Sequence, residues 1–305
     1  MSYALWTAKD LSQIFGVEYT GSNVTGISID SRTVKNGDLF IALKGHKMDG
    51  HKYVDTALKS GANAALVHEG AASQNKLMVE DTFEAINTLA KAARHRIDGQ
   101  VVGITGSYGK TTTKELTAHV LRQVGATHAS QKSFNNHWGV PITLSQMPSF
   151  TKYAVLEMGM NHEGELTALS KLAQPNIALI TDVGLVHKEH FDSLADIVNA
   201  KCEIFHGLQP GGTIILNRDS STYQHQLESA SDSNPGHIIT FGTHKHSTIR
   251  LVHINEELDH SIVTVSIDGQ DITYQLNYIG DHWIKNSMAA LDKYDLTTKI
   301  ICIGI

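Results

Sequence analysis

The sequence predicts an α/β protein with a small N-terminal α/β domain followed by a P-loop-type central domain, which has a mostly parallel sheet and an antiparallel flap. Three observations lead to this fold class. Short apolar runs alternate with helical patterns along most of the chain. A glycine-rich loop follows one of these runs, at 103–115. Near the C-terminus the hydrophobic period shifts to two residues, which is typical of antiparallel strands.

The first predicted domain covers residues 1–97. Apolar runs that predict buried strands alternate in it with helical patterns, at 38–43, 53–60, 64–67 and 82–96. The polar segment 97–100, Ile-Asp-Gly-Gln, has turn composition and precedes the next apolar run, so we expect a domain boundary there. We assign 98–291 to the central domain.

In the central domain, apolar strands separated by helical stretches predict a parallel sheet with crossover helices. The expected strands are 101–105, 153–157, 177–181, 213–217 and 237–241. The expected helices lie near 164–173 and 193–208, and a further helix is expected at 282–291. Between them, 249–276 has period two with a hairpin turn at Asp268-Gly269. A doubly wound sheet binds ligands at the carboxyl ends of its strands, so we examined the residues that follow each strand.

The composition disfavours several classes of protein. The chain has 305 residues, 41% hydrophobic and 18% charged, as ordinary globular proteins do. The net charge of −6 gives no basic surface for nucleic acid or an anionic membrane, so we expect small-molecule partners. Cys202 and Cys302 are the only cysteines, which excludes a disulfide framework. With no signal peptide or membrane helix in the pattern, we expect a cytoplasmic protein that does not insert into membranes.

The segment GITGSYGKTTTKE has the chemistry of a phosphate cradle. Backbone N–H groups of such a loop and of the following helix N-terminus bind phosphate oxygens. Lys110 adds a mobile positive charge, and the hydroxyl of Thr111 can reach Mg²⁺. The strict P-loop pattern has glycine at position 104, where this chain has Ile104, so the loop is a variant. The strand before it and the helix after it favour a phosphate site over a chance glycine turn.

Other residues that follow strands leave alternatives open. Glu157 ends an apolar strand, where a carboxylate either serves a metal or catalysis or caps the next helix. His187 lies in the loop after a strand, although loop histidines are more often solvent-exposed than functional. Lys201 falls partly on the apolar stripe of a helix, where snorkelling is the simplest expectation and pairing or chemical alteration are alternatives. Asn135 and Asn136 by themselves indicate turn chemistry.

Taken in order, six segments of the chain resemble the Mur ligases, the ATP-dependent amide-forming enzymes of peptidoglycan synthesis. The segments are SIDSRTVKNGDLFIALKGHKMDGHKYV, GITGSYGKTTTKE, SFNNHWGVPITL, LEMGMNHEGE, GLVHKEHF with NAKCEIF, and GDHWIKNSMAA. Within the family the resemblance is closest to the members that join D-alanyl-D-alanine to UDP-N-acetylmuramoyl-tripeptide. A member that adds a single amino acid is an alternative, which FNNHWGVP and EMGMN disfavour. A generic P-loop kinase would leave the first domain without a purpose.

The resemblance implies a role for each matching residue. Contacts to ATP are implied for Gly106, Ser107, Tyr108, Gly109, Lys110, Thr111, Thr112, Asn136 and Asn286. Magnesium ligands are implied at Thr111, Glu157 and His187. The implied catalytic residues are Lys110, Glu157, His187 and Lys201, and the last matches a lysine that many members carry as a carbamate. Binding of the UDP-sugar peptide is implied for Ser31, Arg32, Lys44, Gly45, Asp49, Gly50, His51 and Asn135.

The implied chemistry is coherent. A carboxylate of the tripeptide attacks the γ-phosphorus of ATP, and the amine of D-alanyl-D-alanine then attacks the resulting acyl phosphate. Carboxylate and triphosphate repel each other, so Lys110 and magnesium ions are needed to neutralise both. Such in-line transfer requires positioning and charge more than a protein nucleophile. We expect the protein to act as a monomer.

The chain departs from the family pattern in two places. Trp283 stands where the H-N-x-x-N motif has its first asparagine, so one polar contact to the nucleotide is missing. Mur ligases also carry a third, Rossmann-like domain, and the resemblance ends where that domain would begin. We therefore expect 292–305 to be an aberrant tail and the chain to be C-terminally truncated. On this hypothesis a remnant that binds nucleotide or UDP-sugar without catalysis is an alternative function.

Overall fold

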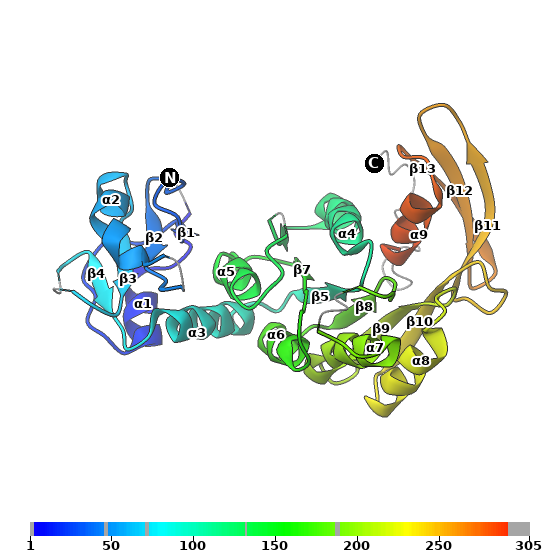
Figure 1. The fold of residues 1–305 in the computed structure, drawn as a ribbon. Coiled ribbons are helices and arrows are strands. Elements are labelled where there is room, and N and C mark those ends of the chain that lie inside the picture. Colours follow the sequence, from blue (N-terminus) through cyan, green and yellow to red (C-terminus); the bar gives the residue numbers. More distant parts are fainter. Residues whose placement is uncertain (1–2, 46–47, 71–72, 132, 187–189, 292–305) are drawn as a thin grey trace. The chain divides into compact units, whose positions relative to one another are not determined.

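The computed structural model describes residues 3–45, 48–70, 73–131, 133–186 and 190–291 (Figure 1). The chain forms two compact units. The first contains the residues up to Ile97 together with Pro141–Phe150, and the second contains Asp98–Val140 and the residues from Thr151 onward. Pro141–Phe150 therefore groups with the first unit, whereas we expected it in the central domain. The expected tail at 292–305 lies outside the described residues.

The first unit is a small α/β domain with a four-stranded parallel sheet in the order β1-β2-β3-β4. Its strands are β1 (Gly26–Ser28), β2 (Asp38–Ile41), β3 (Ala64–Val67) and β4 (Lys76–Met78). Its helices are α1 (Ala8–Phe15), the 3₁₀ turn η1 (Gly50–Tyr53), α2 (Val54–Lys59) and α3 (Thr82–His95). The central strands β2 and β3 are buried along their whole length, which explains their unbroken apolar runs.

The second unit has a nine-stranded sheet in the order β13-β12-β11-β10-β9-β8-β5-β7-β6. Its parallel strands are β5 (Gln100–Thr105), β6 (Thr127–Ala129), β7 (Tyr153–Glu157), β8 (Ile177–Ile180), β9 (Thr213–Asn217) and β10 (His237–Gly242). The predicted flap is β11 (Ile249–Glu256), β12 (Ser261–Ile267) and β13 (Gln270–Leu276). It continues the same sheet, because β11 pairs in parallel with β10 while β12 and β13 are antiparallel. Asp268 and Gly269 both have positive φ, as the predicted hairpin turn requires.

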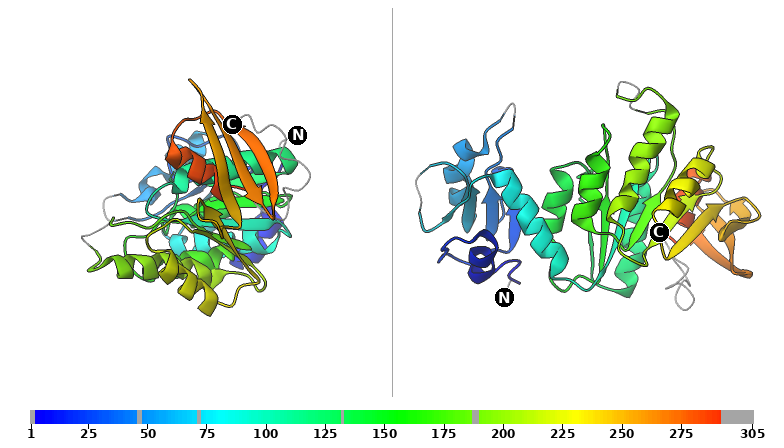
Figure 2. Two further views of the ribbon diagram at one scale, coloured as in Figure 1. Left: turned by 90° about the vertical axis from the view of Figure 1, so that its right-hand side faces the viewer. Right: turned by 90° about the horizontal axis from the view of Figure 1, so that it is seen from below.

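Helices cover both faces of this sheet (Figures 1 and 2). These helices are α4 (Lys110–Val124), α6 (Glu165–Ala173), α7 (Leu194–Cys202) with the 3₁₀ turn η2 (Glu203–Gly207), α8 (Tyr223–Asp232) and α9 (Asp281–Ala289). Helix α5 (Gly139–Ser145) lies between β6 and β7 in the chain, and most of it groups with the first unit. Helices α6, α7 and α8 lie on one face, and α4 and α9 lie on the other. Among the described residues, no helix combines the length and apolarity needed to cross a membrane.

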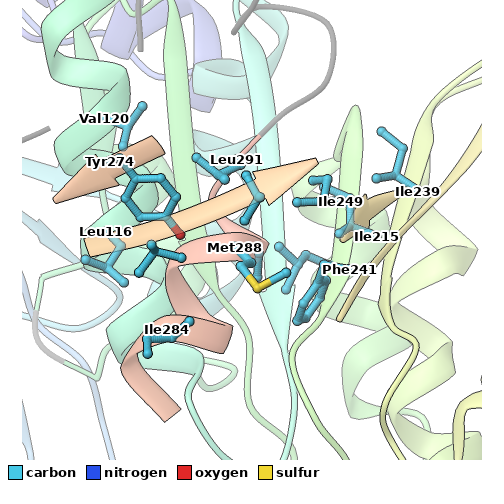
Figure 3. Packing of buried hydrophobic residues seen from close by; sticks show 14 of the residues in the cluster. Leu116, Val120, Ile215, Ile239, Phe241, Ile249, Tyr274, Ile284, Met288 and Leu291 are labelled. Carbon is cyan, nitrogen blue, oxygen red and sulfur yellow. The ribbon is translucent and has the colours of Figure 1, made fainter. Parts of the chain in front are cut away.

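One apolar cluster ties α9 to the face of the sheet that α4 covers (Figure 3). Leu116 of α4 and Ile284 and Met288 of α9 belong to it, and all three side chains are buried. Full burial of such a side chain contributes about 1.5–3 kcal/mol. Helix α9 is therefore held beside α4, whose N-terminus carries the glycine loop.

Helix α8 was not expected from the sequence. It reads YQHQLESASD, and only Gln226 and Ala230 of it are buried. The Gln226 amide donates a hydrogen bond of 2.7 Å to Thr222 Oγ1, so a polar side chain fills an inward position. A short helix with so little apolar surface gives no clear period in the sequence.

The strand order places three loops at one edge of the sheet. Strand β5 lies between β7 and β8. After β5 the chain crosses to β6 at one edge of the sheet, and after β7 it crosses back to β8 on the other side of β5. All three strands are parallel, so their carboxyl ends meet at the same edge. This is the topological switch point at which doubly wound sheets bind ligands.

Candidate functional site

The glycine loop lies at the switch point, between β5 and α4. Gly109 is the N-cap of α4 with φ 77°, and Gly106 has φ 150°. A Cβ at Gly106 would lie 2.0 Å from Thr181 Oγ1, and one at Gly109 would lie 2.5 Å from Asn286 Oδ1. Both positions therefore require glycine, because the neighbouring loop and α9 approach the backbone closely. Asn286, which we expected near the nucleotide, thus contacts the glycine loop itself.

The loop after β8 supports the glycine loop. The Ser107 N–H donates to the Asp182 carbonyl at 2.6 Å, and Thr181 Oγ1 donates to the Tyr108 carbonyl at 2.5 Å. The Ser107 hydroxyl donates to the Gly184 carbonyl at 3.1 Å. We assigned no role to Thr181, Asp182 or Gly184 from the sequence. Their position directly after a strand adjacent to β5 was the available signal.

Lys110, the first residue of α4, turns back toward the loop. Its ammonium group donates to the carbonyl of Gly106 at 2.7 Å and of Ser107 at 3.4 Å. Burial lowers the pKa of Lys110, and the nearby Glu157 carboxylate acts in the opposite direction. The lysine therefore lies within the loop that we expect to hold phosphate, with a negative charge close by.

Glu157 is the buried carboxylate of the site. Its residue surface is 1% exposed. Oε2 accepts a hydrogen bond from Thr111 Oγ1 at 2.9 Å, and Oε1 accepts one from the Asn135 amide at 2.7 Å. The Glu157 N–H also donates to Ser130 Oγ at 3.2 Å. Helix α4 and the loop after β6 thus converge on the carboxylate at the end of β7.

The alternative role of Glu157 as a helix cap is wrong. The N-terminal N–H groups of α6 are bound by another carboxylate, since Gly164 N and Thr167 N donate to Glu203 at 2.6 and 3.0 Å. Glu203 lies in η2 and is 7% exposed. With the cap supplied by Glu203, the Glu157 oxygens face Thr111 and Asn135 instead. Sequence reasoning missed Glu203, because it is far from α6 along the chain.

Lys201 does not snorkel, contrary to our simplest expectation. The residue is 1% exposed, so its side chain does not carry the ammonium group out to solvent. Burial, and to a smaller extent the positive charge of Lys110, together lower the pKa of Lys201 to about 7. A buried lysine beside a second lysine is therefore about half unprotonated at pH 7.

The two adjacent asparagines differ in their contacts. Asn135 binds Glu157, as described above, whereas Asn136 Oδ1 accepts hydrogen bonds from Trp138 N and Gly139 N at 3.1 and 2.9 Å. The second asparagine therefore caps the start of α5, which is the turn chemistry that the sequence indicated. Thr112 lies in the first turn of α4 and is partly buried. His187 lies outside the described residues, so its proposed role stays a prediction.

In the first unit, Lys44 and Gly45 lie close to the residues from Met48 to His51. Lys44 and Asp49 make an antiparallel bridge, and the Gly45 N–H donates to the Met48 carbonyl at 2.8 Å. A Cβ at Gly50 would lie 2.8 Å from Leu43 N, so this position requires glycine. These backbone contacts bring the predicted residues Lys44, Gly45, Asp49, Gly50 and His51 together.

The His51 ring is fixed on both sides. Its Nε2 accepts the His68 N–H at 3.2 Å, so the proton lies on Nδ1, which donates to Asp49 Oδ1 at 2.8 Å. Lys44 Nζ lies 4.0 Å from both Asp49 and Glu69. Asp49, His51 and Glu69 place one ligand atom each within 4.8 Å of one another. Because both ring nitrogens already have partners, we assign no metal to this cluster.

Ser31 and Arg32 belong to a separate exposed turn. The Arg32 guanidinium donates to both oxygens of Asp30, and this hydrogen bonding lowers the pKa of Asp30 to about 2. The Arg32 side chain is 84% exposed. No hydrogen bond or ion pair in the described residues joins this turn to Lys44, Gly45 or residues 48–51. The predicted substrate-binding set of the first unit is thus divided between two surface features.

The fold and site of the second unit define a P-loop-type nucleotide-binding protein. The glycine loop at a parallel-sheet switch point, its lysine and the buried strand-end carboxylate are the defining features. Two family models match the chain, the Mur ligase middle domain at 104–292 and the Mur ligase family catalytic domain at 23–97. The chain belongs to the Mur ligase family.

Individual relatives agree with this membership. The UDP-N-acetylmuramoyl-tripeptide--D-alanyl-D-alanine ligase of Rickettsia prowazekii is 33% identical over 98% of this chain and 68% of its own length. The corresponding ligase of Haemophilus influenzae is 36% identical over 92% of this chain and 62% of its own length. The MurF ligase from Thermotoga maritima, solved in complex with ADP, has a TM-score of 0.73 at 26% identity and covers 87% of this chain. This chain spans 61% of that structure.

Proposed function

We propose that this chain contributes the UDP-sugar-binding and ATP-binding parts of a ligase that joins D-alanyl-D-alanine to UDP-N-acetylmuramoyl-tripeptide. The observation that carries the proposal is the convergence of Lys110, Thr111 and Asn135 around the buried Glu157. The names of the relatives support the choice of substrates, and the ADP complex of one of them supports the nucleotide. We place the reaction in the cytoplasm, where these precursors are made.

The glycine loop binds the ATP phosphates in this proposal. The loop leads into the N-terminus of α4, where the backbone N–H groups and the helix dipole favour negative charge. Lys110 leaves the carbonyls of Gly106 and Ser107 and turns to the β- and γ-phosphates. Thr112 and Asn286 line the same loop, and Asn136 contributes from the start of α5. Positioning of the γ-phosphate and neutralisation of charge are the chemical contributions of these residues.

The residues present fit a magnesium ion. Mg²⁺ prefers hard oxygen ligands, and Glu157 and Thr111 offer a carboxylate and a hydroxyl 2.9 Å apart beside the glycine loop. We propose these two residues and His187 as its protein ligands. When bound, the ion supplies positive charge to the phosphates and to the attacking carboxylate. Asn135 orients Glu157 by holding Oε1, which leaves Oε2 toward Thr111.

Lys201 is suited to carbamylation. About half of its amine is unprotonated near pH 7, because the pKa is lowered to about 7. The amine nitrogen would bond to the carbon of CO₂ and release a proton, which replaces a buried cation by an anion. That anion would lie close enough to Lys110 to be stabilised by it, since the two lysines already influence each other. We propose this modification as the way in which the chain accommodates a buried lysine.

The first unit binds the UDP-sugar in this proposal. Lys44, Gly45, Asp49, Gly50 and His51 form a compact group of mixed charge. Ser31 and Arg32 offer a hydroxyl and a guanidinium at the surface, and guanidinium groups pair well with phosphate oxygens. The ion pair of Arg32 with the half-buried Asp30 is open to solvent on the arginine side, so a diphosphate can compete for the guanidinium.

The proposal is tested by incubating the chain with ATP, Mg²⁺, UDP-N-acetylmuramoyl-tripeptide and D-alanyl-D-alanine, with the products identified by mass spectrometry. Formation of the UDP-muramyl-pentapeptide together with ADP and phosphate would show that this chain carries the whole activity, beyond the two binding parts proposed for it. A panel of single amino acids in place of the dipeptide tests the alternative substrate. Titration calorimetry with ADP and UDP-N-acetylmuramoyl-tripeptide accompanies the assay. Binding of both without product would support a non-catalytic binding function, and binding of neither would overturn the proposal.

A further inference from the structure

Two aromatic rings stack at the junction of β13 and α9. The ring centroids of Tyr278 and Trp283 lie 3.8 Å apart, and their planes are 9° from parallel. Trp283 packs against the apolar cluster beneath α9, whereas Tyr278 is 39% exposed. One face of the tyrosine is therefore covered by a firmly supported tryptophan, and the exposed part of the ring lies away from it. The pair forms a flat aromatic surface with solvent on its outer side.

This surface lies close to the glycine loop. Trp283 and Asn286 are three residues apart on α9, a spacing that puts their Cβ atoms about 5–6 Å from each other on one side of a helix. Asn286 contacts Gly109, the N-cap of α4. Trp283 therefore lies one helical turn from the point where α9 meets the loop. Burial of Ile284 and Met288 against Leu116 keeps α9 in that position.

The chemistry of the surface suits a nucleobase. A nucleotide held by its phosphates at a glycine loop places its base one ribose away from the loop. Stacking of a base on an aromatic side chain strengthens binding without requiring hydrogen bonds to the base edge. Trp283 also replaces the asparagine of the H-N-x-x-N pattern, so this chain has an aromatic ring where an amide would otherwise be available.

We propose that the Tyr278–Trp283 pair is the platform on which the base of the bound nucleotide stacks. The proposal rests on the proposed function, because it assumes that the glycine loop holds the phosphates of that nucleotide. It assigns base recognition in this chain to the outward face of Tyr278, which Trp283 supports from the other side. If the Tyr278–Trp283 pair had a purely structural role, that role would be to close the turn before α9. That turn already has its own hydrogen bond, from Gly280 N to Glu256 Oε1 at 3.1 Å.

The experiment compares ADP with tripolyphosphate, which lacks a base, by titration calorimetry in the presence of Mg²⁺. The test variant carries Tyr278→Ala and Trp283→Ala together, since removal of the tyrosine alone would expose the tryptophan face. We expect the affinity for ADP to fall about tenfold or more, because stacking on aromatic residues has effects of this size, and the affinity for tripolyphosphate to stay unchanged. Tyr278→Phe with Trp283→Phe keeps two rings and should keep ADP affinity. Phe150→Ala, an exposed aromatic residue of the first unit, is the control.

A second measurement does not depend on the folding of the double variant. ADP should change the tryptophan fluorescence of the unmodified chain, tripolyphosphate should not, and Trp283→Phe should abolish the change. Equal weakening of ADP and tripolyphosphate, or an ADP-induced fluorescence change that persists in Trp283→Phe, would overturn the platform. If the unmodified chain binds neither compound, the proposed function itself fails. If it binds both and the variants behave like it, only the platform is refuted.

Discussion

The two units hold their charged residues in opposite ways. In the second unit Glu157 and Lys201 are each 1% exposed, and Glu157 is bound on both oxygens. In the first unit the side chains of Arg32 and Lys44 are 84% and 57% exposed. Buried charges held by hydrogen bonds need no reorganisation when new charge develops beside them, which suits phosphoryl transfer. Exposed charges are screened and can change partners, which suits recognition of a substrate.

The strongest test of this comparison is the substitution Glu157→Gln. The amide has nearly the same shape but removes the buried negative charge, so the metal ligand and the counter-charge of Lys110 are both lost. We expect ATP-dependent phosphate release to fall about 100-fold or more, the usual effect of removing a preorganised electrostatic group. Glu163→Gln is the matched control, because this glutamate is exposed in the loop before α6. Comparable activity in both variants would show that the burial of Glu157 has no catalytic value.

The next largest effect concerns Lys201 and pH. Its pKa is about 7 in the folded state, against 10.5 ordinarily, so the unfolded chain keeps a proton that the folded chain has released. Unfolding therefore takes up a proton in this range, and stability contributed by this group rises with pH between those two values. The slope is on the order of 1 kcal/mol per pH unit.

Urea unfolding in CO₂-free buffers, from neutral pH upward, measures this slope. Lys201→Met should remove it, and Lys171→Met, which changes an exposed lysine of α6, should not. An identical pH dependence in the unmodified chain and Lys201→Met would contradict the depressed pKa. Adding ¹³C-labelled bicarbonate should give a carbamate signal in the carbon NMR spectrum that is absent from the methionine variant.

The smallest effect on stability is expected in the first unit, from Arg32→Ala. The arginine is exposed and its ion pair with Asp30 is screened by solvent, so thermal unfolding should be unchanged. The affinity for UDP-N-acetylmuramoyl-tripeptide should nevertheless fall severalfold, and the deficit should shrink at high salt. Lys9→Ala, another exposed cation of this unit, is the control. A large loss of stability in Arg32→Ala would contradict the comparison, because the exposed charge of Arg32 would then matter for stability as a buried one does.

Much of the second unit was predictable, because its signals are local. The strand, glycine loop and helix at 103–115 follow one another directly, and β7 ends at Glu157 as its apolar run indicated. The Asp268-Gly269 turn was predicted from an equally local signal, and both residues have positive φ. Each of these features depends on a residue type that one backbone conformation or one environment requires. A nucleotide-binding role of Asn286 was expected only from the resemblance and stays a prediction, while the structure places its side chain beside Gly109.

What could not be predicted depends on contacts between distant segments. The complete burial of Lys201 results from packing around α7 that no spacing within the helix reveals. Glu203 caps α6 from a position far along the chain, and Asp182 holds the glycine loop through its backbone carbonyl, which any residue could supply. Helix α8 was not predicted, because Gln226 takes an inward position that apolar residues usually occupy. These arrangements follow from tertiary structure and leave little trace in local sequence.

The inward bonds of Lys110 have a thermodynamic consequence for ligand affinity. Its ammonium group donates to the carbonyls of Gly106 and Ser107. A phosphate that draws the lysine away competes with these bonds, so the measured affinity is the difference between the two interactions. The two carbonyls thereby set a minimum strength for any interaction between an anion and Lys110. A weak anion gains too little to displace the carbonyls, whereas a polyphosphate of high charge density can.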